Sequence, residues 1–272
     1  MEAQLERILA EARAERGKVL VLTGAGISAE SGIPTFRGRD GIWVVGSRNY
    51  VPQEMATHEM FLRNPQEVWR WYLYRFGVVR GAEPNAGHRA LVDLEGALQD
   101  RFTLVTQNID GLHRRAGSSE KRTYCIHGDA AWVRCAADCG VGLLPLPELS
   151  DRSKNAPLGA EDRKRLTCPG CGGWLRPHVL WFDEYYDEEN YRMQSTLRAA
   201  GEASLLLVVG TSGATNLPMQ IGELCWRRNV AMVDVNPEHN PFAELAESTS
   251  RGFFARGTAC ERLPEIVRAL VG

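Results

Sequence analysis

The feature that most constrains the fold of this chain is a glycine-containing turn directly after a short apolar run. Residues 18–23 (Lys-Val-Leu-Val-Leu-Thr) predict a buried strand, and Gly24-Ala25-Gly26-Ile27-Ser28-Ala29 follows in the pattern G-x-G-x-x-A. Glycines at such positions let the backbone turn tightly and approach a pyrophosphate, whose charge is stabilised by the first amides of a helix. The pattern alone also fits an ordinary strand-to-helix turn, so it needs support from other motifs.

Three further apolar runs predict parallel strands, because strands buried on both faces are nearly continuous in hydrophobic residues. These runs lie at residues 102–106, 205–209 and 230–235, and helical spacing occurs at 5–14, 65–79, 86–98, 218–228 and 263–271. The alternation of strands and helices predicts an α/β fold with a Rossmann-like parallel sheet. Ligands of such sheets bind beyond the carboxyl ends of the strands.

Two segments fit the alternation poorly, and we interpret them as insertions that together form a smaller domain. They span residues 39–83, a helical module, and 130–174, a module that contains four cysteines. The larger, discontinuous domain then consists of residues 1–38, 84–129 and 175–272. Within the second insertion, residues 147–166 are predicted to be a solvated loop.

The cysteines and the charge balance narrow the class of protein further. Four of the seven cysteines form two close pairs, Cys135-x3-Cys139 and Cys168-x2-Cys171. Four thiolates suit one tetrahedral zinc ion, and a complete set of protein ligands leaves no position open for a reacting water. We therefore predict one structural zinc ion; four unligated thiols are the alternative, and the other three cysteines are interpreted as structural.

The 32 basic and 34 acidic residues give a net charge of -2, so no overall field attracts nucleic acid or an anionic membrane. No apolar run approaches the roughly 20 residues of a membrane helix. The first residues lack the basic and apolar regions of a leader peptide. We expect a cytoplasmic protein without a membrane or nucleic-acid partner, and the oligomeric state stays open.

Several motifs occur in a fixed order along nearly the whole chain. They are Gly24–Ser28, Gly32–Arg37, Thr106–His113, His127-Gly128, the two cysteine pairs and Gly210–Ser212. Together they resemble the sirtuin (Sir2) family of NAD-dependent protein lysine deacylases. The resemblance implies an enzyme that acts on acylated lysine in proteins, consumes NAD as a co-substrate, and yields nicotinamide and O-acyl-ADP-ribose. It also implies a structural zinc ion in the smaller domain.

The resemblance assigns roles to individual residues. His127 is implied as the general base on the ribose hydroxyl that attacks the imidate carbon, and Asn108 as a second catalytic residue. The residues implied to bind NAD are Gly24, Ala25, Gly26, Ser28, Phe36, Arg37, Gln107, Asn108, Ile109, Asp110, Gly210, Thr211, Ser212, Asn236 and Ala259. Where relatives continue with a Val-Tyr-Pro-like segment, this chain has Gly213–Pro218, which can alter the adenosine side of the pocket. Without the resemblance, a lone histidine after a short strand is more often structural.

The acyl group is indicated by a helix that carries Tyr72 and Arg75 three residues apart, on one face. An arginine binds a carboxylate in bidentate fashion and a phenol adds a hydrogen bond, although both residues are common in packing and surface ion pairs. The spacing resembles the Tyr-x-x-Arg signature of class III sirtuins, which remove succinyl and malonyl groups. Residues 176–182 resemble the family's peptide-binding strand, which implies Val179, Trp181 and Phe182 as substrate contacts.

The leading hypothesis is therefore a deacylase that removes succinyl or malonyl groups and also acetyl groups. Alternatives are an enzyme that is mainly a deacetylase, and an ADP-ribosyltransferase or NAD hydrolase, in which another nucleophile takes the activated ribose. The non-enzymatic alternative is a zinc-stabilised module that binds acylated peptides. The nearly neutral charge and the set of NAD motifs disfavour that module.

Overall fold

A six-stranded, all-parallel sheet forms the centre of the larger part of the molecule, with the strand order β3-β2-β1-β7-β8-β9. The computed structural model describes residues 1–35, 52–149 and 156–272. The strands are β1 (Lys18–Thr23), β2 (Phe102–Thr106), β3 (Thr123–Cys125), β7 (Ala203–Val209), β8 (Ala231–Asn236) and β9 (Gly252–Arg256). The Rossmann-like α/β prediction is confirmed, and β9 is a strand that the sequence analysis did not anticipate.

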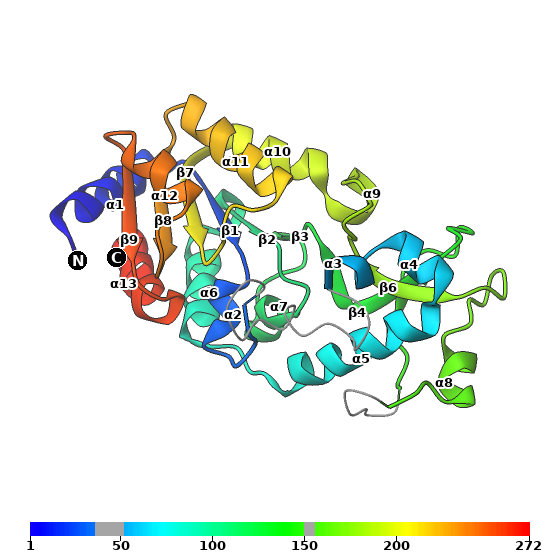
Figure 1. Ribbon diagram of the computed structural model, residues 1–272. Helices are drawn as coiled ribbons and strands as arrows, with labels where there is room; N and C mark the ends of the chain where they lie inside the picture. The colour runs from blue at the N-terminus through cyan, green and yellow to red at the C-terminus, as the bar shows by residue number, and fades with distance from the viewer. Residues whose placement is uncertain (36–51, 150–155) are drawn as a thin grey trace.

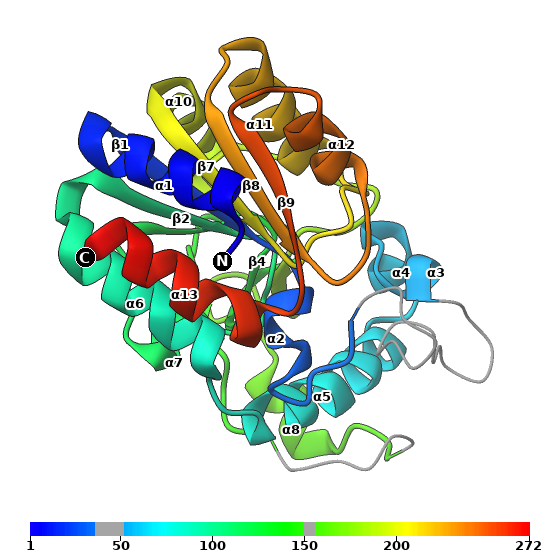
Figure 2. The same ribbon diagram turned by 90° about the vertical axis from the view of Figure 1, so that its left-hand side faces the viewer.

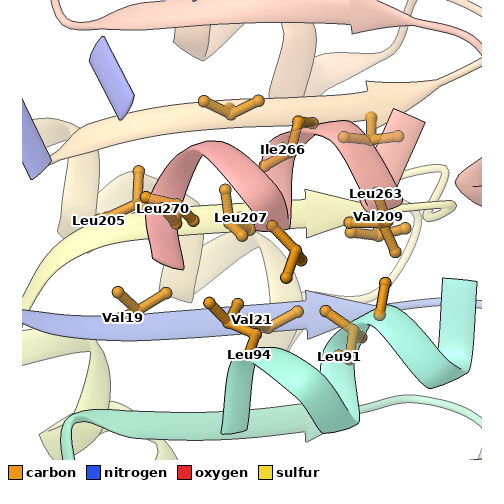
Figure 3. Close-up of a cluster of buried hydrophobic side chains, with 14 of the residues drawn as sticks. Val19, Val21, Leu91, Leu94, Leu205, Leu207, Val209, Leu263, Ile266 and Leu270 are labelled. Atoms are coloured by element: carbon orange, nitrogen blue, oxygen red, sulfur yellow. The ribbon is translucent and has the colours of Figure 1, made fainter. Parts of the chain in front are cut away.

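Helices cover both faces of this sheet, as Figures 1 and 2 show. One face carries α1 (Ala3–Glu15), α6 (Ala86–Leu98) and α13 (Ala259–Val271); the other carries α10 (Met193–Glu202), α11 (Asn216–Arg227) and α12 (Pro241–Glu247). Successive side chains of a strand point to opposite faces. Val19 and Val21 therefore pack against the first set of helices (Figure 3), and Leu20 and Leu22 against the second. Burial on both sides explains why β1 is continuously apolar.

The smaller part of the molecule lies to one side of the parallel sheet (Figure 1) and has its own hydrophobic core. Its sheet is antiparallel, in the order β5-β4-β6. The elements are α3 (Pro52–Met55), α4 (His58–Arg63), α5 (Pro65–Gly81), β4 (Gly128–Cys135), β5 (Leu144–Pro145), α8 (Ala160–Arg165) and β6 (Leu175–Val179). Because β6 pairs with β4, residues 175–179 lie in the smaller sheet, whereas the proposed division assigned them to the larger domain. The division of the other residues into two domains stays a prediction.

The described residues of the segment 147–166 are not all loop. Residues 160–165 form helix α8, and Leu149 and Leu166 on either side of it are buried in the core of the smaller part. The prediction of a solvated loop is therefore wrong for these positions. A helix of six residues is too short for its apolar spacing to stand out in the sequence.

The remaining elements are short and join the main ones. They are α2 (Gly26–Ala29), the 3-10 helix η1 (Gln99–Arg101), α7 (Leu112–Ala116) and α9 (Glu188–Tyr191). Helix α2 ends early, as Gly32 and Pro34 in the sequence predict. Across residues 1–35, 52–149 and 156–272, no helix has both the length and the apolar composition of a membrane span.

Candidate active site

The glycine turn after β1 packs directly against the turn after β7. The amide of Gly24 donates to the carbonyl of Val209 (2.9 Å), and the amide of Gly26 donates to the carbonyl of Gly210 (2.8 Å). A methyl group added at Gly26 would lie 2.6 Å from the Cα of Gly210, which itself has φ +61°. The glycines are therefore required for this close backbone approach between two adjacent strand ends.

The polar residues after β2 contact the same turn. Ser28 donates from Oγ to Asp110 Oδ2 (2.7 Å), while the Asn108 side-chain amide donates to the Gly24 carbonyl (3.1 Å) and to Ser28 Oγ (3.2 Å). Burial raises the pKa of the Asp110 carboxyl, although hydrogen bonds from Leu112 and Ser28 oppose this shift. The structure thus brings Ser28, Asn108 and Asp110 together, as the prediction of one shared site requires.

Gln107 connects this cluster to the atypical segment after β7. Its side-chain amide donates to Thr211 Oγ1 (2.8 Å), and its side-chain oxygen accepts from Thr215 Oγ1 (3.1 Å). Thr215 immediately precedes α11 and belongs to the segment in which this chain departs from the sirtuin pattern. The departure therefore changes the neighbours of a residue that is predicted to bind NAD.

The ends of β8 and α13 complete this edge of the sheet. The Asn236 side-chain amide donates to the Thr211 carbonyl (3.0 Å). Burial raises the pKa of the neighbouring Asp234 to about 7, and this carboxyl accepts from Asn240 (2.7 Å). Ala259 is the buried first residue of α13, so its backbone is the part that a ligand at this edge can reach, whereas Ser212 is exposed.

His127 lies between β3 and β4, where the two sheets meet, and both ring nitrogens have a contact. Nδ1 is 3.0 Å from the Gln107 carbonyl oxygen, and Nε2 is 2.8 Å from the hydroxyl oxygen of Tyr186. Burial lowers the pKa of His127 to about 4, so the imidazole is neutral at pH 7 and can accept a proton. Nothing in the sequence around Tyr186 marks it as a neighbour of His127.

The residues predicted to contact substrate are divided between the interior and the surface. The amide of Leu180 donates to the His127 carbonyl (3.0 Å), which holds the end of β6 beside the histidine. Val179 and Trp181 are buried in the core of the smaller part, so only their backbone groups are available, whereas Phe182 is 55% exposed. Phe36 and Arg37, which are predicted to bind NAD, lie outside the described residues. Ile109 packs against the same core, and its carbonyl accepts from Ala130 (2.9 Å).

Tyr72 and Arg75 are both buried on α5, with exposed fractions of 1% and 5%. Tyr72 accepts a hydrogen bond at its hydroxyl oxygen from the indole N–H of Trp181 (2.8 Å). The Arg75 guanidinium lies 3.6 Å above the ring of Trp71 and donates to the Trp71 carbonyl. Burial lowers the pKa of Arg75 to about 9, which leaves the guanidinium charged at pH 7.

The four predicted zinc ligands converge at one end of the smaller sheet. Their Sγ atoms all lie within 4.8 Å of one another; Cys135 and Cys171 are 3.5 Å apart, and Cys139 and Cys168 3.6 Å. A tetrahedral ion with Zn–S bonds of about 2.3 Å holds its sulfur ligands about 3.8 Å apart. The cluster therefore fits a zinc ion with four protein ligands, which is structural in type.

These features together define a class of nucleotide-dependent enzymes. They are a parallel α/β sheet with a glycine turn at the carboxyl ends of its strands, a polar cluster beside this turn, a neutral histidine and a four-cysteine site. A model of the Sir2 family matches residues 24–216. The chain belongs to the Sir2 family.

Individual relatives agree with this assignment. The chain is 38% identical over 254 residues to an NAD-dependent protein deacylase of Leptospira interrogans serovar copenhageni, covering 93% of both chains. It is 42% identical over 248 residues to an NAD-dependent protein deacylase of Thermus thermophilus, covering 90% of this chain and 89% of the relative.

Solved structures of Sir2 homologues share the whole fold. One, a complex with 2'-O-acetyl ADP ribose, is 33% identical with a TM-score of 0.80 and aligns over 99% of this chain and 96% of its own. Another, a complex with NAD, is 35% identical with a TM-score of 0.75 and aligns over 99% and 94%.

Proposed function

We propose that this enzyme prefers lysine acyl groups that end in a carboxylate, namely succinyl and malonyl. The chain is an NAD-dependent protein deacylase, as its membership of the Sir2 family and its similarity to two enzymes of that name support. The observation that carries the acyl preference is the pair of buried side chains Tyr72 and Arg75, of which Tyr72 is connected to the backbone of His127 through Trp181 and Leu180.

The link runs through Trp181 and its neighbour Leu180. Tyr72 accepts from the indole of Trp181, and the backbone amide of Leu180 donates to the carbonyl of His127. One short segment therefore positions the Tyr72 hydroxyl and the backbone of His127 relative to each other. Such a position suits the far end of an acyl chain whose carbonyl reacts near the histidine.

The two side chains suit a carboxylate for different reasons. Burial raises the pKa of the Tyr72 phenol, so it stays protonated and can donate its hydrogen while its oxygen accepts from Trp181. The Arg75 guanidinium is held against the ring of Trp71, and a held guanidinium binds a carboxylate in bidentate fashion with little further loss of freedom. An arriving carboxylate offsets part of the cost of burying this charge.

We assign the reaction to the cluster at the edge of the parallel sheet. NAD, when bound, supplies the electrophilic ribose carbon from which nicotinamide leaves. His127 takes the proton of a ribose hydroxyl at Nε2, since Nδ1 is engaged by the Gln107 carbonyl. Asn108 is the second catalytic residue, and Ser28, Asp110 and their neighbours orient the ribose.

The other assignments follow the same edge of the sheet. The residues proposed to contact NAD are Gly24, Ala25, Gly26, Ser28, Gln107, Asn108, Ile109, Asp110, Gly210, Thr211, Ser212, Asn236 and Ala259, with Phe36 and Arg37 from outside the described residues. The peptide binds along residues 179–182 through backbone groups. We also propose a reducing compartment, the cytoplasm, which the seven cysteines support because none of them forms a disulfide.

Removing the guanidinium of Arg75 tests the acyl preference. We expect Arg75→Met to lower kcat/KM for a succinyl-lysine peptide by about 10- to 100-fold, the effect of one charged hydrogen-bonding partner. Activity on the matched acetyl peptide should change little. Steady-state kinetics with both peptides measures this.

The matched control is Arg70→Met, on the same helix, because Arg70 pairs with Glu67 near the surface. It should leave both activities unchanged. Equal loss of the two activities in Arg75→Met would mean that Arg75 stabilises α5 and does not select the acyl group. Acetyl removal that exceeds succinyl removal in the unsubstituted enzyme would favour the deacetylase alternative.

A further inference from the structure

The two contacts of His127 define which ring nitrogen carries the hydrogen. A carbonyl oxygen only accepts, so Nδ1, which faces the Gln107 carbonyl, must be the protonated nitrogen of the neutral ring. Nε2 then has only its lone pair, and the hydroxyl of Tyr186, 2.8 Å away, must donate to it. The phenol therefore donates a hydrogen bond to the same nitrogen that must accept a proton during the reaction.

The ring of Tyr186 is fixed in this position from two sides in the chain. Two residues before it, the Glu184 carboxylate accepts from the Trp181 amide (2.9 Å); one residue after it, the Asp187 carboxylate accepts from the Asn190 amide (2.6 Å) and caps α9. The half-buried ring also packs against the hydrophobic cluster beneath α10 and α11. The hydroxyl thus reaches His127 from a held segment.

We propose that Tyr186 is a positioning residue for His127, whose hydroxyl holds Nε2 toward the reacting ribose and stabilises the neutral ring until the ribose hydroxyl replaces it. The inference rests on the proposed role of His127 as the general base. When the ribose hydroxyl arrives, His127 takes its proton at Nε2 and becomes imidazolium, and the hydroxyl oxygen keeps the electron pair with which it attacks. Tyr186 retains its own proton throughout.

Burial and hydrogen bonding, and not nearby charges, shift the pKa values of His127 and Tyr186. Burial lowers the pKa of His127 and the hydrogen bond to the Gln107 carbonyl partly opposes this shift, while burial alone raises the pKa of Tyr186. Among the described residues, no ionised side chain contributes to either shift. A hydrogen bond donated to the unprotonated nitrogen favours the neutral imidazole, so its loss raises the pKa of His127.

The substitution Tyr186→Phe removes the hydroxyl and keeps the ring. Nitrogen NMR of histidine-labelled protein at pH 7.5 should give a protonated Nδ1 and a hydrogen-bonded Nε2 in the unsubstituted enzyme. In Tyr186→Phe we expect the Nε2 resonance to move to that of a free lone pair and the pKa of His127 to rise by about one unit. The adjacent Tyr185, 89% exposed, gives the control Tyr185→Phe, which should change neither quantity.

Kinetics provide a second readout, because His127 acts only after nicotinamide has left. Exchange of labelled nicotinamide into NAD should persist in Tyr186→Phe, whereas the acidic limb of the kcat/KM profile for product formation should move upward with the pKa of His127. An unchanged Nε2 resonance, pKa and pH profile would overturn the inference and leave Tyr186 as a packing residue. Absence of deacylation by the unsubstituted enzyme would instead overturn the proposed function, and the NMR result would still report on the contact.

Discussion

Trp181, together with its neighbour Leu180, connects the proposed acyl-binding residues to the reacting histidine. Its indole N–H donates to the Tyr72 hydroxyl, its ring carries the Arg176 guanidinium at 3.5 Å, and its neighbour Leu180 contacts the His127 backbone. A buried side chain with so many directed contacts has one stable orientation. That orientation decides where the hydrogen of Tyr72 points.

Replacing Trp181 with phenylalanine tests this role at the scale of one hydrogen bond. Trp181→Phe keeps an aromatic ring in the core but removes the N–H donor, so the Tyr72 hydroxyl can turn away from the acyl group. We expect kcat/KM for the succinyl peptide to fall about 3- to 10-fold more than that for the acetyl peptide, the loss of one hydrogen bond. Trp226→Phe, a partly exposed tryptophan on α11, should affect neither.

Some site residues can be recognised from the sequence, and Tyr186 cannot. The difference lies in whether the residue belongs to a local motif. Gly24, Gly26 and Asn108 stand in motifs whose spacing is local, so they can be recognised in the chain. The contact between His127 and Tyr186 joins positions 59 residues apart, and that between Thr215 and Gln107 joins positions 108 apart. Nothing near these residues in the sequence signals such contacts, which exist only after strands far apart in the chain have come together.

Among the elements, the sequence predicted best the strands that are buried on both faces of the parallel sheet. Strands β1, β2, β7 and β8 are continuous apolar runs, and the structure has them within one or two residues of the predicted bounds. Strand β9 was missed because its five residues, Gly-Phe-Phe-Ala-Arg, lie at the sheet edge and include glycine and arginine. Helices α10 and α12, of 10 and 7 residues, were missed because so short a segment shows too few repeats of helical spacing.

The four-cysteine cluster makes a prediction about the stability of the smaller part. Cys139 is exposed, so Cys139→Ser removes a zinc ligand without disturbing the packing of the core. We expect the bound zinc to fall from one ion per chain and the melting temperature to drop by more than about 4 °C, since a structural metal stabilises the folded state directly. Metal analysis and thermal unfolding measure these effects.

The control is Cys260→Ser, a partly buried cysteine outside the cluster, which should retain one zinc ion and nearly the same melting temperature. Treating the unsubstituted enzyme with a chelator should lower the melting temperature in the same direction as Cys139→Ser. A Cys139→Ser protein with full zinc content and unchanged stability would contradict a site made of these four thiols.

In the whole molecule, the candidate site lies where the two sheets meet. The carboxyl ends of β1, β2, β7 and β8 supply the residues proposed to hold NAD, and α5 with the end of β6 supplies those proposed to hold the acyl-lysine (Figure 1). His127, between β3 and β4, belongs to the connection between the sheets. Neither part alone contains both halves of the proposed site, so the proposed reaction requires NAD and the acyl-lysine to meet where the two parts adjoin.

The most direct test of this account is to incubate the unsubstituted enzyme with NAD and two peptides that differ only in a succinyl or an acetyl group on lysine. Mass spectrometry of the nucleotide products, with rates for both peptides, measures the chemistry and the acyl preference together. We expect O-succinyl-ADP-ribose and nicotinamide in equal amounts, with a higher kcat/KM for the succinyl peptide. Free ADP-ribose without loss of the acyl group, or a clear preference for the acetyl peptide, would contradict the account.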